Sequence, residues 1–289
     1  MRAATIEGDA LLEAVGAQVA VPWWSFTKTI VAAAALVLVQ AGRRALDEPL
    51  PGQPFTLRHL LQHRSGLPDY GGLPAYHEAV ARGEPPWPAA ELLRRISADR
   101  LLFAPGQGWA YSNPGYLLVG QAIEATSRLP LGQALRSLVL DPLGIPGARL
   151  AQTPEDLAGV DLGAIARYHP GWVYHGLLVG PLDQAALALH RLMAGKLLPA
   201  ALVALMGEPH RLGGPVPDRP WAEPGYGLGL MCGLDRTGSR VAGHTGGGPG
   251  SVCAVYHLVN SDPPRTAAAF CADGDVDAVE KAAFGRLRP

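Results

Sequence analysis

The chain has 289 residues with a formal net charge of −1, and only 17% of them are charged. This length can bury one large core or two closely packed ones, and the near-neutral charge excludes a basic surface for nucleic acid or an anionic membrane. The 36 glycines and 27 prolines separate apolar segments and form no low-complexity tract. We therefore expect a globular protein whose partner is a small molecule. The oligomeric state is left open.

The sequence shows neither a targeting segment nor a membrane span. Acids at Glu7 and Glu13 stand where a signal peptide has a basic start and an apolar middle. The longest apolar run, about 30–39, is too short to cross a bilayer. Three cysteines without C-x-x-C spacing are typical of buried thiols in a reducing compartment. We expect a cytoplasmic protein that needs no cofactor and no metal.

The first predicted elements are short strands followed by a long buried helix. Residues 1–24 predict one or two strands, with 17–21 the best candidate because a proline follows it. Residues 25–41 are largely apolar on every side and precede a glycine, which is typical of a central helix. Ser25 should lie at the start of that helix, where free backbone N–H groups favour negative charge.

The middle of the chain has the pattern of helices joined by turns. Thr56 is expected to cap a short helix over 57–63, in which His59 and His63 are spaced like metal ligands. No neighbouring acid completes a zinc set, so we interpret both histidines as packing or capping groups. Periodicity predicts further helices over 88–96, 116–124, 131–140, 184–193 and 199–206.

The last part of the chain has the glycine-punctuated pattern of antiparallel strands. The segments are 226–231, 240–244, 251–259 and 266–271, followed by a closing helix over 275–287. Strands at both ends with helices between them predict an α+β fold. We expect an antiparallel sheet flanked by helices, built from residues 1–45 and 205–289, and an all-helical insertion over 46–204. The active site would lie between these two domains.

Ser25 and Lys28 are the residues in which we place the chemistry. Near the start of a helix their side chains share one face, so an amine lies beside a hydroxyl. Alone, Ser25 would more simply be a helix cap, but a Ser-x-x-Lys occurs by chance only about 0.1 times with nine serines and three lysines. A serine nucleophile needs a base, so Lys28 must be desolvated or must hold Tyr111 as a phenolate.

Two further elements follow along the chain, Tyr111-Ser112-Asn113 and His244-Thr245-Gly246. With Ser25-Phe26-Thr27-Lys28 they resemble the three motifs of the serine β-lactamase and penicillin-binding protein superfamily. The tyrosine and the histidine are most similar to the branch with class C β-lactamases, D-alanyl-D-alanine carboxypeptidases and related esterases. The likeness covers roughly residue 17 to the end and includes the stretches 58–70, 111–124 and 141–144.

The resemblance implies a covalent acyl-enzyme mechanism. Ser25 would attack an acyl carbon, while Lys28 and Tyr111 share the roles of base and acid. The oxyanion hole would consist of the N–H groups of Ser25 and Gly247. One such donor is commonly worth about 3 to 4 kcal/mol of barrier, so the geometry of Gly247 should matter more than the helix dipole, at about 0.3 to 1 kcal/mol.

Substrate contacts are implied for Asn113, His244, Thr245 and Gly247, with Asn113 orienting either the substrate amide or the lysine. Most lactamases of this superfamily have a lysine where this chain has His244, so the cation that meets a substrate carboxylate should be only partly present at pH 7. Substrates with a carboxylate should then lose kcat/KM as the pH rises through the pKa of His244. The sequence before Ser25 is also short for the family, which predicts a sheet that lacks one strand.

We therefore expect a serine hydrolase acting on small ester or amide substrates, since without a secretion signal peptidoglycan would be out of reach. A β-lactamase or D-alanyl-D-alanine carboxypeptidase is one alternative, and a catalytically silent binding protein with the same fold is another. An α/β-hydrolase is disfavoured because the chain has no G-x-S-x-G. A phosphate-binding loop over 243–250 is disfavoured because no Lys-Ser/Thr follows it.

Overall fold

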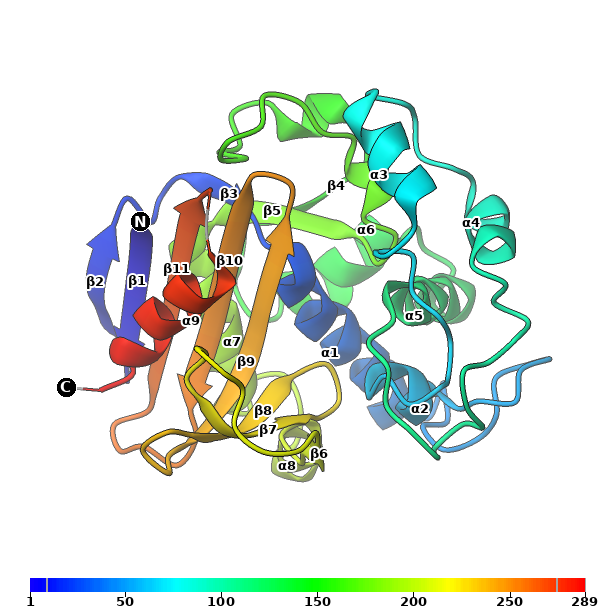
Figure 1. The fold of residues 1–289 in the computed structure, drawn as a ribbon. Helices are drawn as coiled ribbons and strands as arrows, with labels where there is room; N and C mark the ends of the chain where they lie inside the picture. Colours follow the sequence, from blue (N-terminus) through cyan, green and yellow to red (C-terminus); the bar gives the residue numbers. More distant parts are fainter. Residues whose placement is uncertain (9, 274, 289) are drawn as a thin grey trace.

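The computed structural model describes residues 1–8, 10–273 and 275–288. The fold consists of a large antiparallel sheet, a small second sheet and a set of helices (Figure 1). Helix α1 (Thr27–Gln40) lies at its centre and belongs to the main hydrophobic core. Helix α1 is buried along most of its length, as its continuous apolar sequence predicts.

The large sheet is built from both ends of the chain, which confirms the predicted α+β fold. Its strand order is β2-β1-β11-β10-β9-β8-β7-β6, and every neighbouring pair is antiparallel. The strands are β1 (Arg2–Glu7), β2 (Ala10–Val15), β6 (His210–Arg211), β7 (Trp221–Tyr226), β8 (Met231–Asp235), β9 (Arg240–Gly248), β10 (Ser251–Leu258) and β11 (Arg265–Ala272).

Both N-terminal strands of the sheet are present, so the prediction that one is missing was wrong. β1 pairs with β11 on one side and with β2 on the other. Two of its four buried residues are alanines, whose weak strand propensity hid the element. The single strand predicted over 226–231 was also wrong, because residue 226 ends β7, residue 231 begins β8 and the residues between them form the connection.

A small antiparallel sheet lies beside α1. Its order is β3-β5-β4, formed by β3 (Ala20–Pro22), β5 (Leu177–Pro181) and β4 (Arg149–Ala151). Because β4 and β5 belong to the insertion over 46–204, that insertion is not all-helical as predicted. The division of the chain into two domains stays a prediction.

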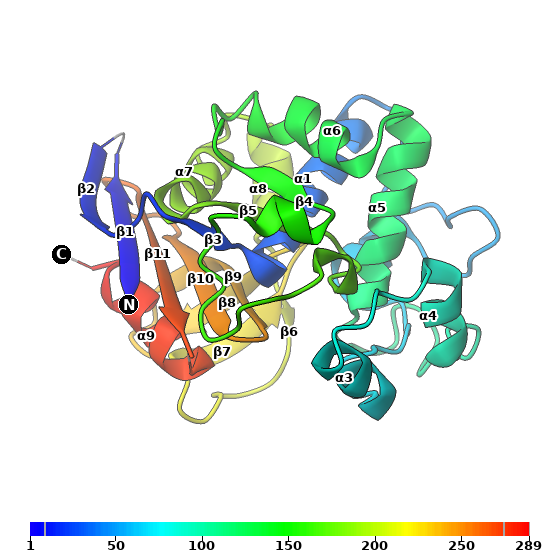
Figure 2. The ribbon, with the colours of Figure 1, turned by 90° about the horizontal axis from the view of Figure 1, so that it is seen from above.

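The helices cover both faces of the large sheet and build the region beyond α1. Figure 2 shows α7 (Leu182–Met193) and α9 (Val276–Gly285) on opposite sides of the sheet, and α5 (Asn113–Ser127) beyond α1. The described residues contain no helix with the length and apolar character that crossing a membrane requires. The remaining helices are α2 (Leu57–Leu61), α3 (Pro74–Ala81), α4 (Ala89–Arg95), α5 (Asn113–Ser127), α6 (Leu131–Leu135), α7 (Leu182–Met193), α8 (Ala200–Met206) and α9 (Val276–Gly285).

Candidate active site

Ser25 lies in a single 3-10 turn, Trp24–Phe26, directly before α1. The α-helix begins at Thr27, later than predicted, because Trp24 adopts a left-handed φ of 43° that interrupts helical geometry just before the serine. Such a conformation costs a bulky residue on the order of 1 to 3 kcal/mol. The Trp24 indole is held by a hydrogen bond to Ser251 Oγ at 3.1 Å. The turn thereby places Ser25 between α1 and β9.

Lys28 follows in the first turn of α1, with Nζ 3.0 Å from Ser25 Oγ. The side chain is fully buried. Its Nζ also lies 2.8 Å from Asn113 Oδ1 and 3.2 Å from each ring nitrogen of His175. Burial lowers the pKa of Lys28 well below that of an ordinary lysine, against a smaller opposing effect of the Asp69 carboxylate. A neutral amine, which can accept a proton, is therefore favoured.

Tyr111 reaches the same hydroxyl from the segment before α5. Its phenol donates a hydrogen bond to Ser25 Oγ at 2.9 Å, and its ring packs on His63 with the centroids 4.2 Å apart. Burial raises the pKa of Tyr111 well above its usual range, so the phenol keeps its proton. Of the two possibilities that the sequence left open, a desolvated lysine fits this site better than a phenolate.

Asn113 is fixed by the loop that carries Asp69. Its backbone N–H donates to Asp69 Oδ1 at 2.8 Å, and its Nδ2 donates to Asp69 Oδ2 at 3.3 Å. Ser112 caps α5 by accepting a hydrogen bond from the N–H of Gly115 at 3.2 Å. Because the amide nitrogen faces the carboxylate, the amide oxygen faces Lys28. The amide oxygen of Asn113 contacts Lys28 Nζ at 2.8 Å, and its role in orienting the lysine or the substrate amide stays a prediction.

β9 passes close to the serine at a pair of glycines. A Cβ at Gly246 would lie 2.2 Å from the backbone nitrogen of Ser25, and one at Gly248 would lie 2.4 Å from the Trp24 ring, so only glycine allows this approach. Gly247 stands between them, and a Cβ there would meet nothing closer than Val252 at 3.6 Å. The oxyanion-hole role of the Ser25 and Gly247 N–H groups stays a prediction.

His244 lies on β9 as a buried, neutral side chain. Its Nδ1 donates to the carbonyl of Thr245 at 2.8 Å, so Nε2 accepts from the Tyr226 hydroxyl at 2.9 Å. Burial lowers the pKa of His244 to about 3. The prediction of a partial cation at pH 7 was therefore wrong. The predicted pH dependence of kcat/KM for substrates with a carboxylate relied on that cation, so it no longer follows. The sequence could not show that the ring is enclosed by aromatic neighbours.

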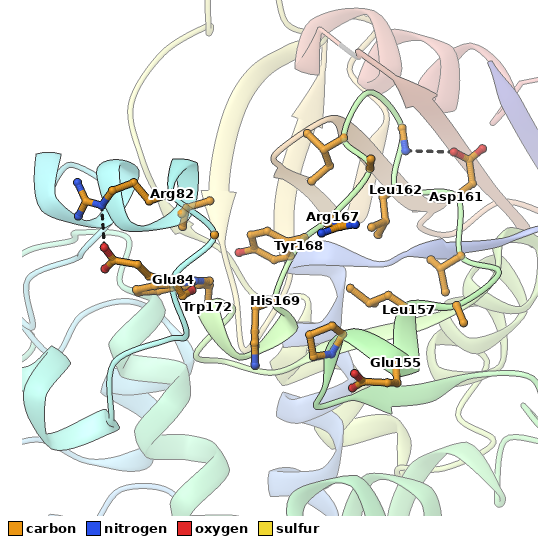
Figure 3. Close-up of a pocket in the computed structure, with 18 residues that line it drawn as sticks. Arg82, Glu84, Glu155, Leu157, Asp161, Leu162, Arg167, Tyr168, His169 and Trp172 are labelled. Atoms are coloured by element: carbon orange, nitrogen blue, oxygen red, sulfur yellow. Dashed lines mark hydrogen bonds and ion pairs between the residues drawn. The ribbon is translucent and has the colours of Figure 1, made fainter.

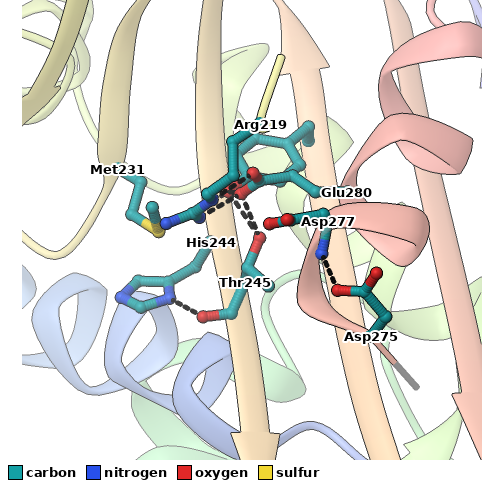
Figure 4. Close-up of polar contacts among 8 residues, drawn as sticks. Arg219, Met231, His244, Thr245, Asp275, Asp277 and Glu280 are labelled. Carbon is teal, nitrogen blue, oxygen red and sulfur yellow. Dashed lines mark hydrogen bonds and ion pairs between the residues drawn. The ribbon is translucent and has the colours of Figure 1, made fainter. Parts of the chain in front are cut away.

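Thr245 points to the opposite face of β9, toward α9. Figure 4 shows its side chain beside Glu280, whose Oε1 accepts from Thr245 Oγ1 at 2.6 Å. Thr245 Oγ1 also lies 2.6 Å from the Tyr256 hydroxyl, and Arg219 donates to both Glu280 oxygens at 2.7 and 2.6 Å. A substrate would have to share the Thr245 hydroxyl with these partners, so its binding role stays a prediction.

His59 and His63 have the packing and capping roles that the sequence favoured. His59 Nδ1 accepts from the N–H of Thr56 at 3.2 Å and completes a capping box on α2. His63 Nδ1 accepts from the N–H of Ser112 at 3.1 Å. Within the described ranges, no three His, Cys, Asp or Glu side chains are grouped so that they could hold a metal ion.

Sequence reasoning missed Asp69, His175 and Tyr226 as parts of the site. Asp69 lies inside the stretch 58–70 that resembles the family, so its position carried a signal. His175 and Tyr226 belong to no motif. Their role follows only from the fold, which buries His175 against Lys28 and Tyr226 against His244.

A cavity of about 960 Å³ adjoins the site. Figure 3 shows Arg82 and Glu84 on one side of the view, Leu157 and Asp161 on the other, and Tyr168 between them. Tyr168 packs edge-on against Trp24 with the ring centroids 5.7 Å apart. Among the described residues, the walls contain none of the predicted site residues, and Tyr168 connects the cavity to the site by its contact with Trp24, the residue before Ser25.

Known proteins match a little under half of the chain by sequence. The chain is 36% identical over 141 residues to the esterase EstB of Burkholderia gladioli, which covers 42% of this chain and 36% of that protein. It is 28% identical over 145 residues to the D-alanyl-D-alanine-carboxypeptidase/endopeptidase AmpH of Escherichia coli (strain K12), which covers 45% of this chain and 37% of that one. The match thus spans little more than a third of each relative.

The likeness to solved structures extends over nearly the whole chain. The D-stereospecific amidohydrolase from Streptomyces sp. superimposes with a TM-score of 0.78 at 24% identity, covering 98% of this chain and 93% of that one, which shows the shared fold. A family model described as Beta-lactamase matches residues 9–273. The chain therefore belongs to the Beta-lactamase family.

Proposed function

We propose that this chain is a serine hydrolase that forms an acyl intermediate on Ser25. The observation that carries the proposal is the position of one hydroxyl between two buried groups, because Ser25 Oγ lies 3.0 Å from Lys28 Nζ and 2.9 Å from the Tyr111 hydroxyl. Acyl transfer needs a nucleophile with a base and an acid in contact. The names of the esterase, carboxypeptidase and amidohydrolase relatives support this class of reaction.

In acylation, the neutral amine of Lys28 takes the proton of Ser25 as Oγ bonds to the acyl carbon. The carbonyl electrons move to oxygen, where the N–H groups of Ser25 and Gly247 stabilise the negative charge. When the intermediate collapses, the leaving group receives the proton of Tyr111 and departs. The Lys28 ammonium then returns its proton to the phenolate. Water attacks the acyl-enzyme by the reverse sequence of proton transfers.

Small neutral esters or amides are the substrates we propose. His244 is neutral, with a pKa lowered by burial to about 3, so it offers no ion pair to a substrate carboxylate. The hydroxyl of Thr245 is backed by the carboxylate of Glu280, and Arg219 is already paired with that carboxylate. An anionic group of a substrate would therefore gain little binding energy at β9. A cytoplasmic location stays a prediction.

Covalent labelling tests the proposal directly. The protein is incubated with a fluorophosphonate and separately with a fluorescent penicillin, and intact mass is measured. We expect a fluorophosphonate adduct on the wild type that is absent from Ser25→Ala. If neither probe labels the folded wild-type protein, the proposed hydrolase activity is wrong and a binding protein without turnover is the better interpretation.

The preferred acyl group is measured with a substrate panel. It contains p-nitrophenyl esters, a chromogenic cephalosporin, a D-alanyl-D-alanine peptide and a D-amino acid amide. We expect the highest kcat/KM with the uncharged esters or the amide, for the electrostatic reason given above. Highest activity with the cephalosporin or the peptide would instead identify a β-lactamase or a carboxypeptidase.

A further inference from the structure

Asp69 contacts the Asn113 amide at the end opposite to Lys28, and the proposed mechanism gives its carboxylate no role. Oδ1 accepts from the backbone N–H of Asn113 at 2.8 Å. Oδ2 accepts from Asn113 Nδ2 at 3.3 Å and from the backbone N–H of Gly71 at 3.0 Å. Both carboxylate oxygens are therefore bonded to donors, and the contact joins the loop after α2 to the start of α5.

A carboxylate accepts hydrogen bonds and donates none, so it selects the end of the Asn113 amide that it meets. The amide nitrogen faces Asp69, and the amide oxygen then faces Lys28, whose Nζ lies 2.8 Å away. A neutral amine has two N–H donors and one lone pair. Because Asn113 Oδ1 is an acceptor, it takes one N–H of the amine and leaves the lone pair unoccupied.

The lone pair is needed at Ser25. Ser25 Oγ lies 3.0 Å from Lys28 Nζ and accepts a hydrogen bond from the Tyr111 phenol at 2.9 Å, so its own proton can point at the amine. An Asn113 amide turned over by 180° would present Nδ2 to the amine instead. The lone pair would then accept from that N–H, and Lys28 could not take the serine proton.

We propose that Asp69 is a positioning residue that fixes the Asn113 amide with its oxygen toward Lys28, and so keeps the lone pair of the base for Ser25. The inference rests on the proposed function, in which Lys28 is the base. It assigns the orientation of the amide to a carboxylate that lies outside the three motifs. Without that carboxylate the amide loses its fixed orientation, and acylation slows even though the base is present and neutral.

The other titratable groups around the amine do not hold the amide. In the part of the chain that the structure describes, the Asn113 side chain is hydrogen-bonded only to Lys28 and Asp69. Asp69 alone can therefore select its orientation from the far side. The remaining titratable side chains are Tyr111 and Tyr116, with ring centroids 4.9 and 5.8 Å from Nζ, His175, with ring nitrogens 3.2 Å from Nζ, and the buried His63 and His244.

The test replaces the carboxylate by an amide of the same shape. In Asp69→Asn, the single accepting oxygen should stay with the backbone N–H of Asn113, which makes the shorter bond and cannot rotate. The introduced NH2 then faces the Asn113 amide, which turns over. For a p-nitrophenyl ester, we expect kcat/KM on the alkaline plateau to fall about 10- to 100-fold, with KM within about a factor of two.

Fluorophosphonate labelling of Ser25 should slow by the same factor in Asp69→Asn. Asp47→Asn is the matched control, because it makes the same chemical change at a carboxylate that is 65% exposed. Its kcat/KM and labelling rate should stay within about a factor of two of the wild type.

The pH profile separates positioning from the charge of Asp69. Burial lowers the pKa of Lys28, and the Asp69 carboxylate opposes this effect. Without the carboxylate the pKa of Lys28 falls further, so the acid limb of kcat/KM should move to lower pH in Asp69→Asn. The loss on the plateau, where Lys28 is neutral in both proteins, is the part that positioning predicts. A plateau equal to that of the wild type would overturn the inference, because Asp69 would then act through its charge alone.

A double-mutant cycle shows whether Asp69 acts through the Asn113 amide. Asn113→Ala removes the amide, so adding Asp69→Asn should lower the plateau by no more than about a factor of two further. Additive losses would overturn the inference, since the substitution would then disturb the site by another route. If Asp69→Asn does not fold, Asp69→Ala takes its place, because it also leaves the amide without a fixed orientation.

The two proposals fail in distinguishable ways. Absence of a Ser25 adduct in the folded wild type removes the proposed function together with this inference. A wild type that labels on Ser25, with Asp69→Asn labelling equally fast at alkaline pH, removes the inference alone. Thermal unfolding of each variant is the control for folding, and a non-additive loss of labelling rate in folded variants supports positioning.

Discussion

Lys28 and Glu280 are both completely buried, and their surroundings differ in kind. Glu280 accepts two hydrogen bonds from Arg219 and one each from Thr245 and Tyr256. Among the described residues, the side chains within hydrogen-bond distance of Lys28 Nζ are uncharged, namely Ser25, Asn113 and His175, and the Asp69 carboxylate acts on it from farther away. One buried group is matched by an opposite charge, and the other is not.

This difference separates a structural ion from a reactive one. Burying an unmatched ammonium is costly, so its pKa falls and it becomes a base. A carboxylate that is paired with a guanidinium and two hydroxyls can instead hold α9 to β9. The two residues lie on opposite faces of the same region of β9. One face of the strand therefore contacts the hydrogen-bonded network of Glu280, and the other contacts the site of Lys28.

The largest effect is expected from Lys28→Met, which keeps the volume and removes the base. We expect kcat/KM for an ester to fall by about 10³-fold, a typical loss for a general base. In the wild type, kcat/KM should decrease as the pH falls through the lowered pKa of Lys28, because the protonated amine cannot accept the serine proton. A loss below tenfold would remove Lys28 from the role of base.

The same substitution should leave the fold intact or strengthen it. Replacing a buried, unmatched polar group by an apolar one of similar size is often neutral or stabilising. We therefore expect a melting temperature for Lys28→Met that is equal to or above that of the wild type. A clear decrease would show that the amine contributes to stability, and the comparison with Glu280 would lose its basis.

Glu280→Met should have the opposite effect on stability. It leaves Arg219 half-buried without its carboxylate and removes the acceptor of Thr245 and Tyr256, so we expect a loss of about 3 kcal/mol in the free energy of unfolding. Urea denaturation measures it, and Glu280→Gln is the matched control that keeps the shape and removes the charge. A loss below about 1 kcal/mol in both variants would mean that this network does not hold α9 to the sheet.

His244 predicts a smaller, pH-dependent effect. Its pKa is about 3 in the folded protein and near the ordinary value of 6.5 in the unfolded chain. Between these values the unfolded chain binds a proton that the folded protein does not, so the free energy of unfolding falls as the pH decreases. One group contributes about 1.4 kcal/mol per pH unit, and His244→Gln should remove that contribution.

Unfolding at pH 6.5 and at pH 5 checks this effect. The stability lost between the two pH values should be about 1.6 kcal/mol smaller in His244→Gln than in the wild type, because the unfolded histidine is already half protonated at pH 6.5. Burial also lowers the pKa of His63 and His175, so some acid sensitivity remains in the variant. Equal losses in the two proteins would show that His244 is protonated in the folded state.

The sequence predicted the parts of the site that depend on local spacing. Ser25 and Lys28 lie three residues apart at the start of α1, and Tyr111 and Asn113 lie at the start of α5, so short motifs identified them as candidates. The sequence did not show that His244 is enclosed by Tyr226 and loses its charge, because burial depends on packing between distant strands. For the same reason no pattern marked His175, which the path of the chain before β5 buries against Lys28.

The fold was likewise predicted where the local sequence pattern is strong. Central strands such as β9 and β10 were recognised from their glycines and β-branched residues, and α1 from its unbroken apolar run. The alanine-rich β1 and the short β4 carried too little signal, since their pairing partners, rather than their own side chains, fix them as strands. The missed elements are therefore those at the edges of the two sheets or with small side chains.

The smallest effect is expected at the ion pair of Arg58 and Asp47. Its geometry resembles that of Arg219 and Glu280, because the guanidinium again meets both carboxylate oxygens, but the Asp47 side chain is 65% exposed. Water competes for both partners, so Asp47→Asn should change the free energy of unfolding by less than about 1 kcal/mol. Urea denaturation at low and at high salt measures this, and Glu280→Gln provides the buried counterpart. Equal losses at the two sites would mean that the bidentate geometry decides the energy. A large loss at Glu280 alone would mean that burial does, which is the property that also makes Lys28 reactive.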